Sequence, residues 1–519
     1  MCKKINIKFL SAALIIDLFI IGTLKYGNAS IKRCRIHISK PIIALTFAPI
    51  FLIAGSFRFR EMYGIVPVEQ MIFHLMMSRD GAQFSMVYEV VITTIIDSAI
   101  VFILLLSLLS VEIKFRNNFF CININAIYQR MSIIFLSAFG ICFFIVNMGI
   151  PPYIYSLQKE PSAFYEENYI DPNGVEITFP DQKRNLIVIF IESLETGFLT
   201  REDGGAFSED LIPDVKKLME NNINFSSGGG PGGACQLHGT GWTIAGITAQ
   251  YSGVPLTIAW MDGNEYGRLV SRFLSGASGV GDVLYKAGYK NYFILGSEIE
   301  FGARDKYFKT HKDTVIYDYN YFLDNNYIPD DYNVWWGFED RKLYDFAKEK
   351  IAEITKDYPF FITILTADTH PVGGYLDTSA VRRFDSQYKN VLFDMNKQLS
   401  GFLEWLKEQE FYENTTVVVL GDHLYVDFSV FPKDYQSKRF PVNIFINSLL
   451  SGDNTKNRIF SHFDMFPALI DSIGGVYSAK GLALGRSMNK GESTLLEEFG
   501  FDYVNDALQE RSNYYNKLW

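Results

Sequence analysis

Long apolar stretches fill most of the chain before residue 155, and a more polar sequence follows them. Four of them stand at about residues 9–24, 41–57, 90–111 and 131–150. As a helix, each is about long enough to cross a hydrocarbon core of about 30 Å. The pattern therefore predicts an all-α bundle of four transmembrane helices over residues 1–150.

Two features of this bundle leave alternatives open. The first stretch would also suit a cleavable signal peptide, although no small-x-small cleavage site follows it and three further apolar stretches do. Asp17 and Asp97 lie inside the first and third stretches, where a carboxylate is costly unless it faces other helices or stays protonated. Each is interpreted either as a contact with another helix or a lipid headgroup, or as a tolerated polar residue near the interface.

Basic residues gather in the loops after the first and third stretches, at Lys25, Lys32, Arg33, Arg35 and Lys40 and at Lys114, Arg116 and Arg130. Because short basic loops tend to stay in the cytoplasm, the N-terminus and everything after residue 150 are expected outside it. Residues 66–78 carry apolar positions at helical spacing. This segment suits either a helix along the outer membrane surface or an ordinary loop helix.

The pattern changes after Pro151-Pro152, which are expected to end the fourth span because proline cannot continue a helix. Residues 151–184 are interpreted as a linker with an entry strand, residues 185–490 as one domain, and residues 491–519 as a helical tail. Short β-rich runs at 186–191, 292–295, 360–365 and 416–420 alternate with helical patterns such as 390–408. They predict an α/β domain with a mostly parallel central sheet.

Polar residues of the kind that bind metals or phosphate follow three of these runs directly: Glu192-Ser193, Asp368 to His370, and Asp422-His423. In a parallel sheet the chemistry gathers beyond the carboxyl ends of the strands. A buried carboxylate needs a cation, hydrogen bonds or solvent, and adjacent Asp and His can hold one divalent ion. Between the first two sites, within residues 228–253, a glycine-rich loop enters a helix of small residues, and the N–H groups there suit a phosphate.

Composition removes some classes of protein. A net charge of −10 gives no support to nucleic-acid binding, which needs a basic surface. The five cysteines include no CxxC pair, so neither a disulfide framework nor a cysteine zinc site is indicated. Cys235 also lacks the Cys-x-Pro-x-Arg context that sulfatases use to make formylglycine, which argues against sulfate-ester chemistry.

Five motifs in a fixed order carry a resemblance to a known family. They are ESLE after a strand (192–195), GTGWTIAG (239–246), FGARDKYFKTH (301–311), DTHP (368–371) and GDH (421–423). This set resembles the alkaline-phosphatase/sulfatase superfamily, and within it the lipoteichoic acid synthases and the phosphoglycerol transferases that modify periplasmic glucans. The similarity covers residues 185–488 and implies a sulfatase-like fold behind a multi-pass membrane anchor.

The resemblance also implies roles for individual residues. The nucleophile would be Thr243, with Thr240 as runner-up, and the metal ligands would be Glu192, Thr243, Asp422 and His423. The substrate would be bound by His370 at the phosphate, by Arg304 at the headgroup, and by His311. The chain departs from the family pattern at Ser297, where relatives carry aspartate, and near Phe301 and Gly302, where some relatives carry tryptophan.

The implied function is a two-step transfer at the outer face of a bacterial inner membrane, with the catalytic domain on the periplasmic or extracellular side. Phosphoglycerol would pass from a phospholipid such as phosphatidylglycerol to Thr243, and then to an envelope glycan or a glycerol-phosphate chain. One divalent ion would activate the threonine, with manganese expected and magnesium or zinc also compatible with the ligands.

Three other functions remain open at this point. A phosphoethanolamine transferase would share the nucleophile, the metal and the anchor, but such relatives usually carry several disulfides in the exported domain. A metal-dependent phosphodiesterase or sulfatase-like hydrolase would often need more Asp and His ligands than this sequence clearly provides. A catalytically inactive envelope-assembly protein would have no need of the intact set of Glu192, Thr243, Asp422 and His423.

Overall fold

The computed structural model describes residues 29–33, 40–64, 66–76, 84–109, 111–115, 126–257, 273–354 and 359–519. They belong to two compact units. One unit lies within Met1–Ile65 and Phe84–Pro151, and the other within Val66–Gln83 and Pro152–Trp519. We call the second the catalytic unit, because it contains every candidate site residue.

The first unit is built on three helices, α2 (Lys40–Tyr63), α4 (Phe84–Leu109) and α5 (Ala126–Asn147), with a small antiparallel pair, β1 (Ala29–Arg33) and β2 (Val111–Phe115). Helix α2 packs against both α4 and α5. The three helices occupy the second, third and fourth predicted spans, whereas the first apolar stretch and Asp17 lie outside the described residues. Asp97 forms an ion pair of 2.7 Å with Arg58 of α2, so its contact is with another helix.

Length and apolar character do not clearly mark these helices as membrane spans. In the described part of the chain, no single helix meets both requirements for crossing a bilayer. One bent pair does so jointly, formed by Ile134–Asn147 and Ile150–Ser156 with an angle of 60° between them.

The fourth apolar stretch ends differently from the sequence prediction. Helix α5 stops at Asn147, before the two prolines, and Gly149 then adopts a left-handed backbone with a φ of +74°. Pro151 and Pro152 lie in the first turn of the next helix, α6 (Ile150–Ser156). There a proline is tolerated because its missing N–H would have no partner in the helix. The prolines thus begin a helix instead of ending one.

A six-stranded sheet forms the centre of the catalytic unit, in the order β5-β4-β6-β3-β7-β8. Five strands run parallel, and β8 at the edge is antiparallel to β7, which confirms the mostly parallel sheet predicted from the sequence. The strands are β3 (Asn185–Ile191), β4 (Lys290–Leu295), β5 (Val315–Tyr317), β6 (Phe360–Leu365), β7 (Thr415–Gly421) and β8 (Asn443–Ile446). A short hairpin, β9 (Gly481–Leu482) and β10 (Gly485–Arg486), lies apart from it.

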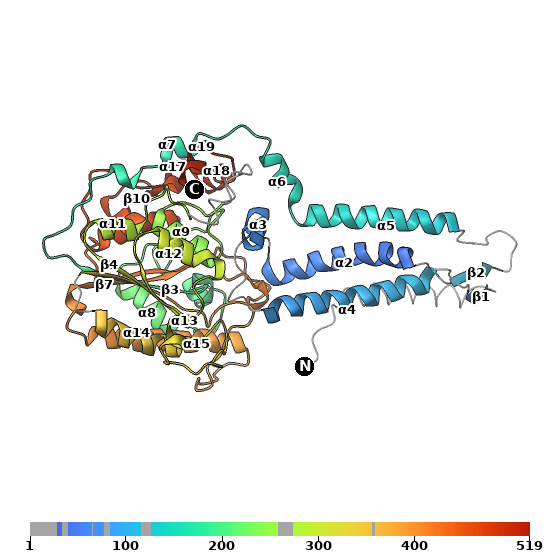
Figure 1. The fold of residues 1–519 in the computed structure, drawn as a ribbon, viewed down its shortest axis with the longest axis horizontal. Coiled ribbons are helices and arrows are strands. Elements are labelled where there is room, and N and C mark those ends of the chain that lie inside the picture. Colours follow the sequence, from blue (N-terminus) through green and yellow to red (C-terminus); the bar gives the residue numbers. More distant parts are fainter. Residues whose placement is uncertain are drawn as a thin grey trace. The chain divides into compact units, whose positions relative to one another are not determined.

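Helices cover both faces of this sheet (Figure 1). One layer contains α9 (Thr243–Ser252), α11 (Val280–Lys286), α12 (Arg304–Thr310) and α16 (Met465–Ser472). The other contains α8 (Pro213–Asn221), α13 (Tyr319–Asp324), α14 (Asp340–Ile354) and α15 (Gln387–Lys407). Further α-helices described in this unit include α3 (Val68–Met76), α7 (Phe164–Asn168), α17 (Leu495–Phe499), α18 (Phe501–Ala507) and α19 (Asn513–Leu518).

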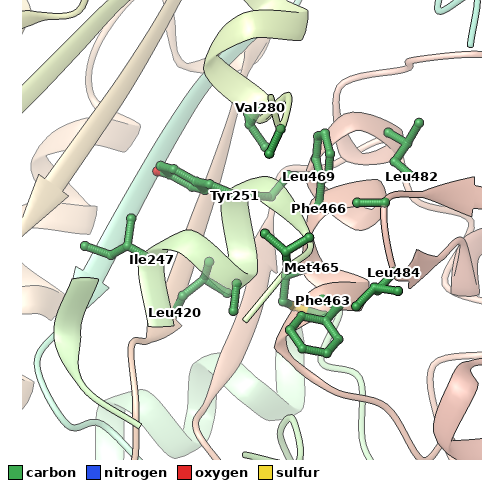
Figure 2. Packing of buried hydrophobic residues seen from close by; sticks show 14 of the residues in the cluster. Ile247, Tyr251, Val280, Leu420, Phe463, Met465, Phe466, Leu469, Leu482 and Leu484 are labelled. Atoms are coloured by element: carbon green, nitrogen blue, oxygen red, sulfur yellow. The ribbon is translucent and has the colours of Figure 1, made fainter. Parts of the chain in front are cut away.

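Strand β3 explains why both faces need a cover. Its alternate residues Leu186, Val188 and Phe190 belong to the hydrophobic core around α9, and Ile187, Ile189 and Ile191 belong to the core around α15. Successive side chains of a strand point to opposite faces, so a run of seven buried residues requires apolar layers on both sides. Figure 2 shows the first of these cores, where Ile247 and Tyr251 of α9 lie among Leu420, Met465 and Leu469.

The catalytic unit extends beyond residues 185–490 at both ends. Phe164 and Tyr165, in the segment interpreted as a linker, are 3% and 1% exposed and lie in the core around α9. Tyr515 and Leu518, in the segment interpreted as a tail, lie in the same core. Helix α3 also belongs to this unit, although it comes from the loop between α2 and α4.

Candidate functional site

The candidate site is formed where neighbouring strands of the sheet end. Strand β3 lies between β6 and β7, so the residues after these three strands meet at one edge. Glu192 follows β3, His370 comes five residues after β6, and Asp422 and His423 follow β7. All four residues belong to the sets of polar residues that were predicted from the sequence to lie at the carboxyl ends of the strands.

Three of these residues form a buried cluster that could hold a metal ion. Ligand atoms of Glu192, Asp422 and His423 all lie within 4.8 Å of one another. Nε2 of His423 lies 3.3 Å from Oε1 of Glu192 and 3.5 Å from Oδ2 of Asp422. None of the three residues is more than 4% exposed.

Hydrogen bonds hold each ligand in a defined orientation. The backbone N–H of Glu192 donates to the Thr366 hydroxyl at 3.1 Å, which ties β3 to the loop after β6. Oδ1 of Asp422 accepts the N–H groups of Ser193 and His423 at 2.7 and 2.8 Å. Nδ1 of His423 lies 2.8 Å from the Leu424 carbonyl, so this nitrogen carries the proton and leaves Nε2 free to bind a metal.

Electrostatics favour a cation at this position. Burial and the nearby charge of Glu192 raise the pKa of Asp422 to about 8. Burial alone would lower the pKa of His423, but the negative charges of Asp422 and Glu192 raise it to about 10. Oδ2 of Asp422 accepts no hydrogen bond from the described residues. The set consists of two buried carboxylates, one with an oxygen that accepts no hydrogen bond from the described residues, and an imidazole Nε2 that faces both of them. Such a ligand set fits a divalent ion.

Thr243 lies at this cluster, at the first position of α9. Its hydroxyl donates to Oε2 of Glu192 at 3.1 Å. Gly246 explains how α9 can approach Asp422 so closely, because a Cβ at this position would lie 2.0 Å from the carbonyl oxygen of Asp422. Helix α9 therefore packs directly on the backbone of a candidate ligand, with Thr243 one turn earlier.

Thr240, the runner-up nucleophile, has a different environment. It is fully buried, and its hydroxyl donates to the Leu237 carbonyl at 2.8 Å and accepts the Leu237 N–H at 3.1 Å. These bonds close a tight turn in the glycine-rich loop. The geometry therefore favours Thr243 over Thr240 as the reactive hydroxyl.

His370 and Arg304 lie close to the cluster. Nδ1 of His370 is 2.6 Å from the Pro371 carbonyl, which leaves Nε2 for another partner. Burial lowers the pKa of His370, and the charge of Glu192 opposes this shift. Burial also lowers the pKa of Arg304, to about 10, and Glu192 is the main charge that opposes it. The charge of Glu192 therefore acts on the pKa of both side chains.

The position of His311 is different. Its Nδ1 lies 2.7 Å from Oδ2 of Asp282, and its ring packs on Tyr307 at 4.4 Å between centroids. Neither described partner belongs to the cluster around Glu192, so the contact of His311 with substrate stays a prediction. Asp368, in the DTHP motif, also stands outside the cluster and accepts no bond at Oδ1 from the described residues.

Sequence reasoning missed Trp336, which completes the wall beside His370. Its ring lies 4.5 Å from the ring of His370 and 5.0 Å from that of Phe301, over which the guanidinium of Arg304 stands at 5.6 Å. Trp336 is 9% exposed. The signal in the sequence was the Trp335-Trp336 pair in a loop of polar residues, but no periodic pattern connected that loop to the GARD motif.

Two donors in this wall have no hydrogen-bond partner among the described residues, Nε1 of Trp336 and Nε of Arg304. A buried donor without a partner is costly, by about 1–3 kcal/mol. Both donors belong to the same group of packed side chains as His370 and Phe301.

A family model described as "Sulfatase" matches residues 184–476. Among curated proteins, the chain is 30% identical over 327 residues to phosphoglycerol transferase I of Escherichia coli O139:H28 (strain E24377A / ETEC) and equally to that of Shigella flexneri. These alignments cover 61% of this chain and 40% of each relative. The chain thus matches about two fifths of the length of these relatives.

Solved structures with a similar fold include a protein in the alkaline phosphatase superfamily from Vibrio parahaemolyticus, at 21% identity and a TM-score of 0.45 over 64% of this chain and 76% of the other. The lipoteichoic acid synthase LtaP from Listeria monocytogenes matches at 15% identity and 0.45, over 61% and 79%. The integral membrane phosphoethanolamine transferase EptA from Neisseria meningitidis matches at 12% and 0.45, over 84% and 85%.

Proposed function

The chain belongs to the sulfatase family, and we propose that it is a membrane-attached, metal-dependent transferase that moves phosphoglycerol from a phospholipid to an envelope acceptor. The observation that carries the proposal is the hydroxyl of Thr243, which donates to Glu192 within the buried cluster of Glu192, Asp422 and His423. The alignment of 327 residues with phosphoglycerol transferase I supports the choice of reaction.

The first half-reaction forms a bond between Oγ1 of Thr243 and phosphorus and breaks the bond between phosphorus and the diacylglycerol oxygen. Thr243 loses its hydroxyl proton, and the departing oxygen gains one to give diacylglycerol. A divalent ion bound by Glu192, Asp422, His423 and Thr243 would lower the pKa of the hydroxyl and offset charge on the phosphoryl oxygens. Glu192 accepts the hydrogen bond of the hydroxyl and so directs the oxygen toward the substrate phosphate. The N-terminus of α9, where Thr243 lies, also favours negative charge.

In the second half-reaction an acceptor hydroxyl attacks the same phosphorus and releases Thr243. His370 and Arg304 stand beside the cluster and would bind the phosphoryl oxygens in both steps. A glycan or a growing glycerol-phosphate chain would supply the acceptor. Water in place of this acceptor would make the same site a phosphodiesterase.

The wall around Trp336 favours glycerol over ethanolamine as the headgroup. Nε1 of Trp336 and Nε of Arg304 are donors that need acceptors, and glycerol hydroxyls can accept hydrogen bonds. An ammonium group can only donate, and it would meet the positive charge of Arg304. A phosphoethanolamine transferase is the second candidate, and this arrangement of donors disfavours it.

We also propose that the first unit anchors the chain in the bacterial inner membrane, with the catalytic unit on the periplasmic or extracellular side. Helices α2, α4 and α5 at three of the four predicted spans support this location, as does the basic character of the loops assigned to the cytoplasm. An anchor of this kind would hold the site close to a lipid donor.

The test uses the full chain in detergent with Mn²⁺ and vesicles that contain headgroup-labelled phosphatidylglycerol or phosphatidylethanolamine. Diacylglycerol release and transfer of label to a periplasmic glucan are measured together, with Thr243→Ala as the blank. We expect phosphatidylglycerol to be used at least about tenfold faster, because a site built to bond hydroxyls rejects a headgroup that leaves its donors unpaired. Preference for phosphatidylethanolamine would contradict the headgroup assignment, and release of free glycerol phosphate alone would indicate a hydrolase.

A further inference from the structure

Helix α3 (Val68–Met76) is separated in sequence from the rest of the catalytic unit. It lies in the loop between α2 and α4, and both of those helices belong to the other unit. Residues 66–83 nevertheless group with residues 152–519. A segment from the helical half of the chain is thus part of the compact unit that contains the candidate site.

Phe73 is the residue of α3 that enters the core of this unit. It is 1% exposed, whereas Leu75 on the same helix is 71% exposed. The ring of Phe73 lies 5.9 Å from that of Trp242 and 6.2 Å from that of Phe273, in a perpendicular arrangement with the latter. Such distances are typical of stabilising aromatic pairs.

Trp242 connects this contact to the candidate nucleophile. It is the residue directly before Thr243, with an extended backbone (φ −150°, ψ 161°), and its carbonyl accepts the N–H of Gly246 at 2.8 Å. Its indole Nε1 is buried and makes no hydrogen bond to the described residues. The indole is therefore held by packing, and α3 contributes to it with Phe73 at 5.9 Å and with His74 at 6.1 Å between ring centroids.

We propose that Phe73 is a positioning residue for the nucleophile. Helix α3 holds the indole of Trp242, and Trp242 in turn fixes the point at which α9 begins and hence the distance from Thr243 to Glu192. The inference rests on the proposed function, because it assigns to the loop between α2 and α4 a part in the same reaction. According to this proposal, turnover depends on α3, which lies outside the residues 184–476 that the family model matches.

The experiment compares Phe73→Ala, Phe73→Leu and the exposed control Leu75→Ala in the full chain. Each is assayed on headgroup-labelled phosphatidylglycerol vesicles and on the soluble diester bis(p-nitrophenyl) phosphate, which needs no membrane. We expect Phe73→Ala to lower kcat by about 10–100-fold on both substrates, because small misplacements of a reacting group are that costly. KM should change by less than about twofold, since ground-state binding is retained. Phe73→Leu should restore most of the turnover, and Leu75→Ala should match the wild type.

A double variant tests the route through Trp242. If Phe73 acts through the indole, Phe73→Ala combined with Trp242→Ala should be no slower than Trp242→Ala alone. Multiplicative losses in the double variant would overturn the inference. So would wild-type turnover in Phe73→Ala, a loss restricted to the lipid substrate, or loss of bound metal and of thermal stability in Phe73→Ala and Phe73→Leu alike.

Failure of the proposed function gives a separate result. In that case the wild-type chain releases no diacylglycerol from phosphatidylglycerol, whatever the Phe73 variants do. The positioning role is then still measured on the soluble diester, where the contrast between Phe73→Ala and Leu75→Ala either appears or does not.

Discussion

Glu192 and Asp422 are buried carboxylates in contact with one imidazole, and their charges are balanced only in part by the side chains around them. The charge of Glu192 contributes to the raised pKa of Asp422, and Oδ2 of Asp422 has no donor among the described residues. A divalent ion would relieve this repulsion and satisfy the unused oxygen. The cluster could thus hold a divalent ion on physical grounds as well as by likeness to a family.

Removing one of the two carboxylates should therefore weaken metal binding sharply. We predict that Asp422→Ala lowers the affinity for Mn²⁺ by more than about 100-fold, since removing a side chain that merely supports a ligand already costs about 10–100-fold. The control is Asp434→Ala, an exposed aspartate paired with Arg201. Calorimetric titration of the full chain measures both, and wild-type affinity in Asp422→Ala would remove this residue from the ligand set.

Asp471 offers a pH test away from the metal cluster. Burial raises its pKa to about 6, despite the hydroxyl of Ser487 that donates to Oδ2 at 2.5 Å. A carboxyl whose pKa is raised on folding binds more protons in the folded state, so stability falls as pH rises from about 4 to about 6. The side chain in Asp471→Asn cannot ionise, so the stability of this variant should not decrease in this way. Relative to the wild type, its free energy of unfolding should rise by roughly 2–3 kcal/mol between about pH 4 and about pH 6, at about 1.4 kcal/mol per pKa unit.

Tryptophan fluorescence is a suitable probe for that comparison, because all six tryptophans lie between residues 242 and 519 and so report on the catalytic unit. The exposed Asp453→Asn serves as the control and should follow the wild type. A parallel pH dependence of unfolding in Asp471→Asn and the wild type would show that the buried carboxyl does not titrate in this range.

The sequence predicted much of the site, because its residues lie at the ends of strongly patterned strands. Glu192, Asp422 and His423 follow buried runs, and the topology brings such positions together whatever loops lie between them. Trp336 could not be placed in the same way, since its contact with His370 depends on the path of an irregular loop. His311 lies in a motif of the family, yet its described partners, Asp282 and Tyr307, lie outside the candidate cluster. The spacing of a motif does not distinguish a histidine that binds substrate from one that supports the fold.

At the scale of elements, α9 and its contact with the strand ends decide where the hydroxyl of Thr243 lies. The long buried strands β3, β6 and β7 were predictable from apolar runs of five or six residues. Strands β5 and β8 were not, because three- and four-residue strands at the sheet edges give no such run. The double proline was misinterpreted because proline suits the first turn of a helix as well as the position after one.

The close approach of α9 to β7 gives a prediction about packing. Gly246→Ala places a Cβ against the carbonyl of Asp422, and we expect it to destabilise the catalytic unit by about 1–3 kcal/mol, as overpacking does, and to weaken metal binding. The control is Gly401→Ala on α15, where no atom lies within 4 Å and alanine should stabilise the helix by about 0.5–1 kcal/mol. Equal melting temperatures and metal affinities in the two variants would contradict this account of α9.

At the scale of the whole molecule, the catalytic unit takes residues from two separate ranges of the sequence, Val66–Gln83 and Pro152–Trp519. Its core includes the segment before β3, the last helices and α3, so the boundaries 185–490 leave out apolar side chains that pack with the rest. Periodicity alone could not reveal this, because these short segments carry few apolar residues each. Their place in the core depends on contacts with elements far away in the sequence.

This organisation predicts how a truncated chain behaves. A fragment from Lys159 to Trp519 keeps the sheet and both helical layers and should fold, but without α3 it exposes the rings of Trp242 and Phe273. We expect it to remain soluble and to melt at a lower temperature than the catalytic unit of the full chain, by about 1–2 °C for each kcal/mol lost in a unit of this size. Melting followed by tryptophan fluorescence makes the comparison, and an unchanged melting temperature would contradict the assignment of α3 to this unit.

The central claim is that Thr243 carries the phosphoglycerol group between donor and acceptor. Its most direct test is to incubate the full chain with Mn²⁺ and headgroup-labelled phosphatidylglycerol, quench without acceptor, and locate the label by mass spectrometry of peptides. We expect a phosphoglycerol adduct on Thr243 in the wild type and in Thr240→Ala, and none in Thr243→Ala, which should keep its fold and bound metal. Label on Thr240, or equal label and diacylglycerol release in Thr243→Ala, would contradict it.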